Sequence, residues 1–164
     1  KLYLNRNFLD NKILIKEENN MYSILEKTIL LKSVNLFQNI PGNILSKIAQ
    51  IASEIHLEEK DFIFKEGDSG SSLFVIISGK VDIIKNNQII ASLEQGNCIG
   101  EMSLLDQEPR SADALSNGES TLLKIDQNGF FELMASNSEI IKQIMKMLTK
   151  RLRQTNKKLT DSLK

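Results

Sequence analysis

The chain of 164 residues carries 21 Lys and Arg against 21 Asp and Glu, so its formal net charge is zero, and it contains one cysteine, Cys98. This balance excludes a general electrostatic attraction to nucleic acid or membranes, and one cysteine excludes a disulfide framework or thiolate cluster within the chain. We find no signal peptide and no apolar run near the roughly 18 residues of a membrane span. A cytoplasmic domain with no nucleic-acid or membrane partner in this segment is expected.

The N-terminal part is predicted to contain a linker and two helices. Residues 1–20 are polar and Asn-rich, and we interpret them as a linker or the tail of an upstream region, with the domain itself over 21–164. Helices are expected over 21–54, with Pro41 in the first turn of the second. The first, from Met21 to Leu31, has apolar positions near one side at Ile24, Leu25, Thr28, Ile29 and Leu31. The second has a stripe of Ile44, Leu45, Ile48, Ile51 and Ile55.

A change of period marks a β region over 55–126. From Ile55 apolar residues alternate, and Gly and Asn residues punctuate the chain, as in short strands joined by turns. The branched and aromatic runs that predict strands are 62–64, 73–77, 81–84, 89–93 and 121–125. The fold class predicted is therefore mainly β with flanking helices, built on a small antiparallel sandwich or barrel.

Helices return over 127–160. A short one is expected over 127–135 and a long one from Ser138, with a stripe at heptad spacing of Ile141, Met145, Leu148, Leu152, Thr155, Leu159 and Ser162. Such a helix can cover the barrel with its first part and pair with a second copy through its later part. The hydroxyl of Thr155 interrupts the apolar seam, and a polar group there normally has a specific partner.

The stretch Gly100 to Ala112 concentrates the groups that an anion site needs. Gly100 allows close approach of the backbone, and a helical turn starting at Glu101 would direct free N–H groups at an anion. Arg110 supplies a permanently charged, planar donor set that suits a phosphate. An ionised Glu101 only accepts hydrogen bonds, so a sugar hydroxyl is its expected partner. The simpler interpretation is a surface loop with an ion-paired arginine and a capping glutamate.

This stretch resembles the phosphate-binding cassette of cyclic nucleotide-binding domains, the type found in catabolite activator proteins and protein kinase A regulatory subunits. The pattern is Gly-Glu-x-x-Leu followed by Arg-x-Ala, and the matching residues are Gly100, Glu101, Leu104, Pro109, Arg110 and Ala112. Asp113 departs from the family's frequent Thr or Ser. Residues 65–68, 73–76 and 78–81 also look like the family's jelly roll, so the resemblance spans about 36–159.

The resemblance implies a jelly-roll β-barrel and a regulatory module that binds a cyclic nucleotide, cAMP or alternatively cGMP, with no further cofactor and no enzyme activity. It implies that Arg110 holds the phosphate, Glu101 holds the ribose 2′-hydroxyl, and the last helix caps the base and carries the signal. Thr155 and Asn156 match the family's adenine contacts, whereas Ser111 can also serve a guanine. The predicted ligand-binding residues are Gly100, Glu101, Met102, Ser103, Arg110, Ser111, Ala112, Thr155 and Asn156.

Three other interpretations remain open at this stage. A metal-dependent enzyme of the cupin type needs several histidines, whereas this chain has only His56. A ligand-free structural or dimerisation domain of the same fold would normally lack the arginine or the acid. A transcription factor would continue into a helix-turn-helix, whereas the sequence stops at Lys164. Since it also starts with lysine, we expect a regulatory domain from a larger bacterial protein.

Overall fold

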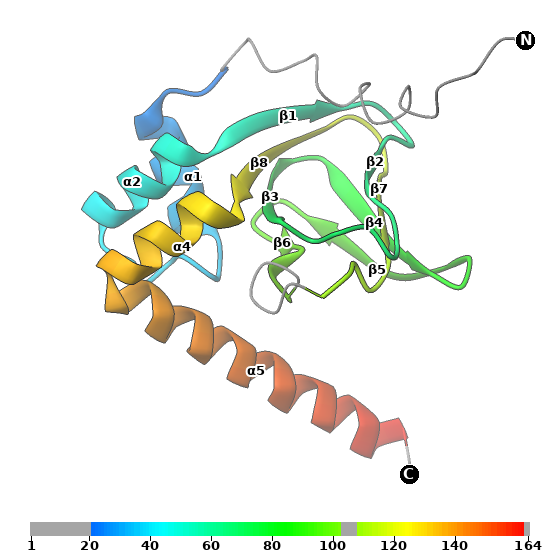
Figure 1. Ribbon diagram of the computed structural model, residues 1–164. Coiled ribbons are helices and arrows are strands. Elements are labelled where there is room, and N and C mark those ends of the chain that lie inside the picture. The colour runs from blue at the N-terminus through cyan, green and yellow to red at the C-terminus, as the bar shows by residue number, and fades with distance from the viewer. Residues whose placement is uncertain (1–20, 103–107, 163–164) are drawn as a thin grey trace, which may run out of the picture.

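A computed structural model describes residues 21–102 and 108–162. The interpretation of 1–20 as a linker and the roles predicted for Ser103 and Leu104 lie outside these residues. Figure 1 shows helices at one side of a β structure, with the long helix α5 extending from α4 to the C-terminus. No helix in the described part of the chain combines the length and the apolar character that a membrane crossing requires.

Two helices precede the strands: α1 (Ile24–Ser33) and α2 (Gly42–Ile51). A capping box starts α1, because the Ser23 hydroxyl accepts from Glu26 N and the Glu26 carboxylate accepts from Ser23 N. Pro41 is the N-cap of α2, one residue before the position that the sequence suggested. The stripe of α2 is buried as predicted at Ile44, Leu45 and Ile48, whereas Ile51 is 38% exposed.

The prediction for α1 was right about the helix and about Leu31, but three of the other apolar positions that it grouped on one side are exposed. Ile24, Leu25 and Ile29 are exposed, whereas Lys27 and Leu31 are buried. The physical reason is an ion pair: Lys27 Nζ lies 3.2 Å from a carboxylate oxygen of buried Glu54. This contact places the Lys27–Leu31 side of the helix against the core and leaves Ile24, Leu25 and Ile29 facing solvent.

Eight strands form two antiparallel sheets in the described chain. The first sheet has the order β1-β8-β3-β6 and the second β2-β7-β4-β5. The strand bounds are β1 (Ser53–Leu57), β2 (Phe62–Phe64), β3 (Ser72–Ser78), β4 (Lys80–Lys85), β5 (Gln88–Glu94), β6 (Cys98–Ile99), β7 (Asp113–Ser116) and β8 (Ser120–Asp126). The mainly β fold class is confirmed. The pairing gives two four-stranded sheets, so a closed barrel is not shown.

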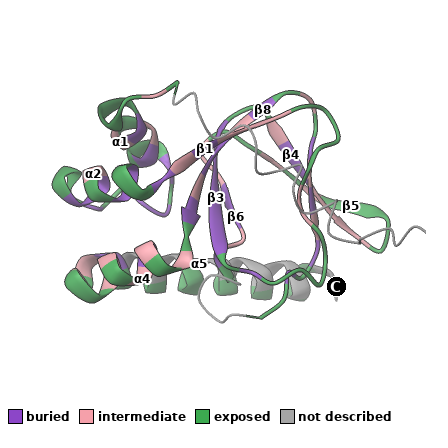
Figure 2. Cartoon of the chain, turned by 45° about the horizontal axis from the view of Figure 1, so that its top comes forward, coloured by how far each residue is buried: buried purple, intermediate pink, exposed green. Residues whose placement is uncertain are grey.

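Strand β3 connects the two cores because it is buried on both faces. Leu73, Val75 and Ile77 belong to the core shared with the helices, and Phe74 and Ile76 belong to the core between the sheets. Successive side chains of a strand point to opposite faces, so one uninterrupted apolar run serves both layers. In Figure 2, β3 is buried along most of its length, whereas the β5 hairpin is largely exposed.

The strands are followed by helices α4 (Gln127–Ser136) and α5 (Ser138–Ser162). Phe130 of α4 and Ile140 at the start of α5 are fully buried in the helical core. Beyond that point the described apolar side chains of α5 are exposed. They are Ile141, Met145, Leu148 and Leu152, with exposures of 41%, 63%, 37% and 62%. The described part of the heptad stripe of α5, from Ile141 to Leu152, is therefore uncovered in this structure.

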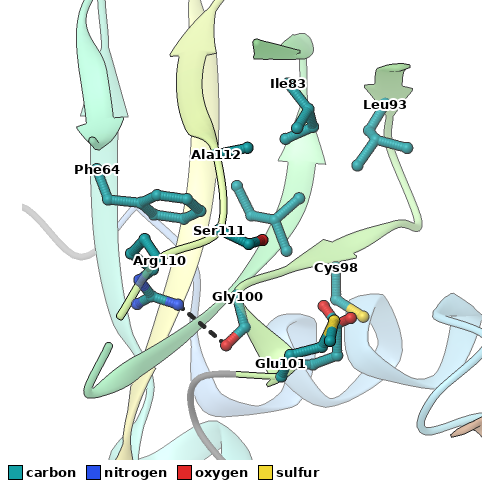
Figure 3. A pocket seen from close by; sticks show the side chains of 11 residues that line it. Phe64, Ile83, Leu93, Cys98, Gly100, Glu101, Arg110, Ser111 and Ala112 are labelled. Carbon is teal, nitrogen blue, oxygen red and sulfur yellow. Dashed lines mark hydrogen bonds between the residues drawn. The ribbon is translucent and has the colours of Figure 1, made fainter. Parts of the chain in front are cut away.

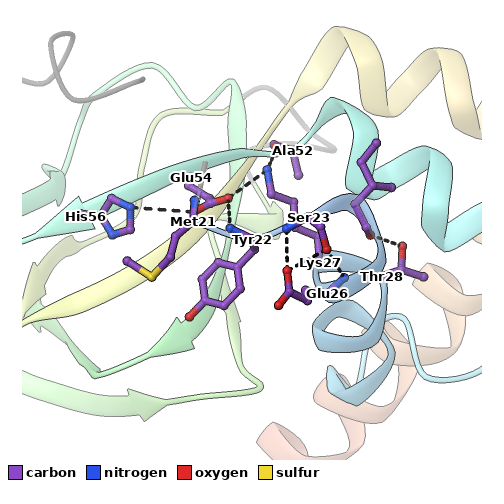
Figure 4. Close-up of polar contacts among 10 residues, drawn as sticks. Met21, Tyr22, Ser23, Glu26, Lys27, Thr28, Ala52, Glu54 and His56 are labelled. Atoms are coloured by element: carbon purple, nitrogen blue, oxygen red, sulfur yellow. Dashed lines mark hydrogen bonds and ion pairs between the residues drawn. The ribbon is translucent and has the colours of Figure 1, made fainter. Parts of the chain in front are cut away.

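Glu54 fixes the point at which the chain enters the domain (Figure 4). Its carboxylate accepts from Met21 N at 2.9 Å and from Tyr22 N at 3.1 Å, and it pairs with Lys27. Lys27 Nζ also donates to the Ala52 carbonyl at 3.1 Å. His56, in β1, lies 3.8 Å from Glu54. A buried carboxylate thereby connects β1 to the N-terminal end of α1.

Glu54→Ala should lower the free energy of unfolding by about 3–5 kcal/mol, because Lys27 would remain buried without its counter-charge. Urea unfolding measures the change. The matched control is Glu59→Ala, since Glu59 pairs with Lys60 at 3.7 Å with 67% of its side chain exposed. That change should stay within about 0.5 kcal/mol of wild type. Equal losses in the two variants would contradict an anchoring role for Glu54.

Candidate functional site

A pocket of about 170 Å³ is lined by residues of β2, β4, β5 and β6 and by the segments that contain Gly100 and Arg110 (Figure 3). One side is apolar and comes from β2, β4 and β5, and the other side comes from residues 98–102 and 110–112. Its lining consists of Phe64, Ile83, Leu93, Cys98, Ile99, Gly100, Glu101, Met102, Arg110, Ser111 and Ala112. The pocket therefore joins a hydrophobic wall to charged and polar groups, as small-molecule sites generally do.

On the polar side of the pocket, two main-chain carbonyl groups hold the Arg110 side chain. Its Nη1 donates to the Gly100 carbonyl at 3.0 Å and its Nη2 to the Ser72 carbonyl at 2.7 Å. Its own backbone is fixed as well, because Arg110 N donates to the Asp68 carbonyl at 2.8 Å and Gly67 N donates to the Arg110 carbonyl at 2.9 Å. The guanidinium is thus placed by three separate segments of the chain.

The guanidinium of Arg110 is buried, with 5% of the residue exposed. It lies over the Phe64 ring at 4.3 Å from the centroid, a cation–π contact that partly replaces water. Burial lowers the pKa of Arg110 from its ordinary value, and the negative charges of Asp68 and Glu101 oppose that shift. Its Nε has no hydrogen-bond partner within the described chain. An unpartnered buried donor on a cation favours an anionic ligand.

Gly100 is required at its position for two separate reasons. Its φ of +77° is in the left-handed region, which favours glycine. A Cβ added there would overlap Arg110 Nη1 and lie 3.0 Å from the Ser72 carbonyl oxygen. The missing side chain is therefore what allows the guanidinium to reach the Gly100 carbonyl.

Glu101 follows Gly100 directly and places a carboxylate in the same pocket. It is 6% exposed, and Glu101 and Met102 are helical, as the predicted turn requires. A buried cation, an acid that can accept from a hydroxyl, and an apolar wall together suit a ligand with a phosphate, a sugar and a flat apolar part.

Six of the nine predicted ligand-binding residues line this one pocket: Gly100, Glu101, Met102, Arg110, Ser111 and Ala112. Ser103 lies outside the described residues, and so does the side chain of Thr155. Asn156 is exposed on α5 and is not part of the lining. Their contact with a ligand stays a prediction.

The sequence did not identify the apolar wall of the pocket, formed by Phe64, Ile83 and Leu93 together with Cys98 and Ile99. Alternation within a strand shows that two faces differ, but it does not tell which neighbouring strands enclose a cavity. His56, the single histidine, lies in β1, where its Nδ1 is 3.2 Å from the Thr121 hydroxyl. The described residues contain no group of three or more metal-ligating side chains.

The two-sheet fold carries a pocket in which a buried arginine, an acid and an apolar wall meet. Residues 54–137 match the model of the cyclic nucleotide-binding domain. The chain belongs to the cyclic nucleotide-binding domain family, whose members are regulatory modules, and the resemblance stated from the sequence is confirmed.

The chain is similar to a CRP-like cAMP-activated global transcriptional regulator of Mycobacterium tuberculosis, with 26% identity over 80% of this chain and 61% of that protein. It is 29% identical to human cGMP-dependent protein kinase 2 over 70% of this chain and 16% of the kinase. The structure resembles the catabolite activator protein of Thermus thermophilus, with a TM-score of 0.70 and 27% identity over 77% of this chain and 62% of that one. The chain thus spans only part of these relatives, which come from both bacteria and eukaryotes.

Gly100→Ala should destabilise the protein for two reasons. Alanine is strained at a φ of +77°, and in addition its methyl group would displace the Arg110 guanidinium. The matched control is Gly118→Ala, since Gly118 has a φ of +89° but open space where a Cβ would lie. The control should lose about 1–2 kcal/mol, the cost of the left-handed region for alanine. Urea unfolding of both variants measures the difference, and equal losses would mean that the contact with Arg110 imposes no constraint.

Proposed function

We propose that this chain binds a cyclic nucleotide, with cAMP as the first choice, and couples its capture to movement of α5. The observation that carries the proposal is the buried guanidinium of Arg110, whose Nε has no described partner, in a pocket shared with Gly100 and Glu101. The cyclic phosphate would compensate the charge that burial has removed from water. Arg110 is thus the proposed phosphate anchor.

Glu101 is the proposed ribose contact. It lies one residue after Gly100 in the pocket lining, so a ligand that places its phosphate at Arg110 brings its sugar close to this carboxylate. A carboxylate accepts but does not donate, which suits the 2′-hydroxyl. The apolar wall of Ile83 and Leu93 offers a surface for the base.

The exposed stripe of α5 supports the proposed switch. Met145 and Leu152 are 63% and 62% exposed, so α5 has an apolar surface available to cap a base or to pair with a second copy. Thr155 and Asn156 would then accept from the adenine N6 amine, whereas guanine presents a carbonyl there. A nucleotide moves α5 only if it binds the capped arrangement more tightly than the uncapped one.

The names of the relatives support the ligand class and differ on the nucleotide. The Mycobacterium regulator is described as cAMP-activated, whereas the human kinase is described as cGMP-dependent. The alternative function is a nucleotide-free structural or dimerisation domain of the same fold, which the exposed stripe of α5 also suits. Because the chain spans only part of these relatives, we propose that it works as the regulatory domain of a larger protein.

A thermal-shift measurement with cAMP, cGMP and adenosine tests this function. A nucleotide at about 100 times its dissociation constant adds about 2.7 kcal/mol to the free energy of unfolding. We expect cAMP to stabilise the protein most, cGMP less, and adenosine, which lacks the phosphate, not at all. Equal shifts with cAMP and cGMP would contradict the role of Thr155 and Asn156, and no shift with either would favour the nucleotide-free alternative.

The role of Glu101 is tested with the 2′-deoxy analogue of cAMP. Wild type should bind cAMP more tightly than the analogue by about 1–3 kcal/mol, because the analogue has no 2′-hydroxyl to donate to the buried carboxylate. Glu101→Gln should reduce this preference, since the amide is a weaker acceptor. Calorimetric titration gives both affinities. Equal affinity of wild type for the two ligands would show that Glu101 does not contact the ribose.

A further inference from the structure

Three hydrogen bonds link four residues at the rim of the pocket, and the backbone from Ser111 to Asp113 closes them into a ring; Glu66 and Lys85 lie outside the stretch Gly100 to Ala112. Lys85, the last residue of β4, donates to the Ser111 carbonyl and pairs with Glu66 Oε1, both at 2.5 Å. Glu66 N in turn donates to Asp113 Oδ1 at 2.6 Å. We call Glu66, Lys85, Ser111 and Asp113 the rim ring. It connects the turn after β2, the end of β4 and the segment that carries Arg110.

The rim ring gives Asp113 a structural role. Asp113 occupies the position after Ala112, where the family frequently has Thr or Ser. One oxygen of its carboxylate accepts from the Glu66 amide. Through Glu66 it supports the ion pair to Lys85, so the acid stabilises the cassette from its outer side.

Lys85 contacts a peptide group in the lining of the pocket, because its Nζ donates to the Ser111 carbonyl. Ser111 and Ala112 both line the pocket, and Ala112 is 6% exposed. The described chain contains no cis peptide bond, so the Ala112 N–H points away from the Ser111 carbonyl. Because that carbonyl is directed at Lys85 on the half-exposed rim, the Ala112 N–H is directed to the opposite side.

We propose that Lys85 is a positioning residue of the nucleotide site: by holding the Ser111 carbonyl, it presents the Ala112 N–H to one exocyclic oxygen of the phosphate. The proposal rests on the proposed function and deepens it. Lys85 acts through geometry rather than as a second phosphate cation, because Glu66 already balances its charge. Loss of Lys85 removes the side-chain contact that holds the Ser111 carbonyl, so the 111–112 peptide is less firmly oriented and the ligand contact through the Ala112 N–H weakens.

The test compares Lys85→Met, which keeps the aliphatic stem, with Lys85→Arg, which keeps the donor. Lys80→Met is the matched control, since Lys80 is on the same strand, is similarly exposed at 42% and pairs with Glu94. Affinity for cAMP or cGMP, whichever wild type binds more tightly, is measured by calorimetry. Lys85→Met should weaken binding about 3- to 10-fold, the effect of losing one partly exposed charged contact. Lys85→Arg and Lys80→Met should stay within about twofold of wild type.

The two phosphorothioate diastereomers of the cyclic nucleotide separate positioning from simple stability. Sulfur replaces one or the other exocyclic oxygen, so an N–H directed at one oxygen makes wild type prefer one diastereomer. Lys85→Met should bring the ratio of the two affinities closer to one. An unchanged ratio, or affinity equal to that of Lys80→Met, overturns the role of Lys85 while the proposed function stands. Absence of nucleotide binding by wild type overturns both.

Discussion

Burial of the Arg110 guanidinium is the constraint on which the site depends. Removing a full charge from water costs several kcal/mol unless close contacts replace the lost hydration. Here the replacement comes from the carbonyls of Gly100 and Ser72 and from the Phe64 ring. None of these three contacts carries a full charge, but the negative charges of Asp68 and Glu101 also act on the guanidinium. Because its Nε has no partner within the described chain, Arg110 still offers a donor to an anion.

The surrounding fold explains why these groups stay in place. Ser72 begins β3, the strand buried on both faces, and β6 pairs with β3 immediately before Gly100. The two carbonyls that hold Arg110 therefore belong to neighbouring segments of one sheet. The opposite face of β3 packs against the helical core that includes Ile140 at the start of α5. β3 therefore contacts both the segment that holds Arg110 and the core that contains the start of α5.

Sequence reasoning was most successful where local chemistry determines the structure. Runs of branched and aromatic residues predicted β2, β3, β4, β5 and β8, and the spacing within 100–112 predicted the group of residues that lines one side of the pocket. The two-residue strand β6 and the strand β7 fall in none of these runs. The β7 sequence Asp-Ala-Leu-Ser lacks strong strand formers, and β7 is a strand because it pairs with β2 and β4. Tertiary contacts also decided the orientation of α1. Pairing of Lys27 with Glu54 placed Lys27 inside, and the apolar side chains of Ile24, Leu25 and Ile29 stayed exposed. Lys85 belongs to no motif, so only the structure could place it at the site.

Calorimetric titration of wild type and Arg110→Ala with cAMP and cGMP tests the central claim most directly. If the buried guanidinium is the phosphate anchor, Arg110→Ala should lose about 2–5 kcal/mol of binding free energy, the range for removing one partner of a buried charge pair. Circular dichroism should show the same β fold in both proteins. If the variant keeps an affinity within about threefold of wild type, which is a loss of less than about 0.7 kcal/mol of binding free energy, the account is contradicted.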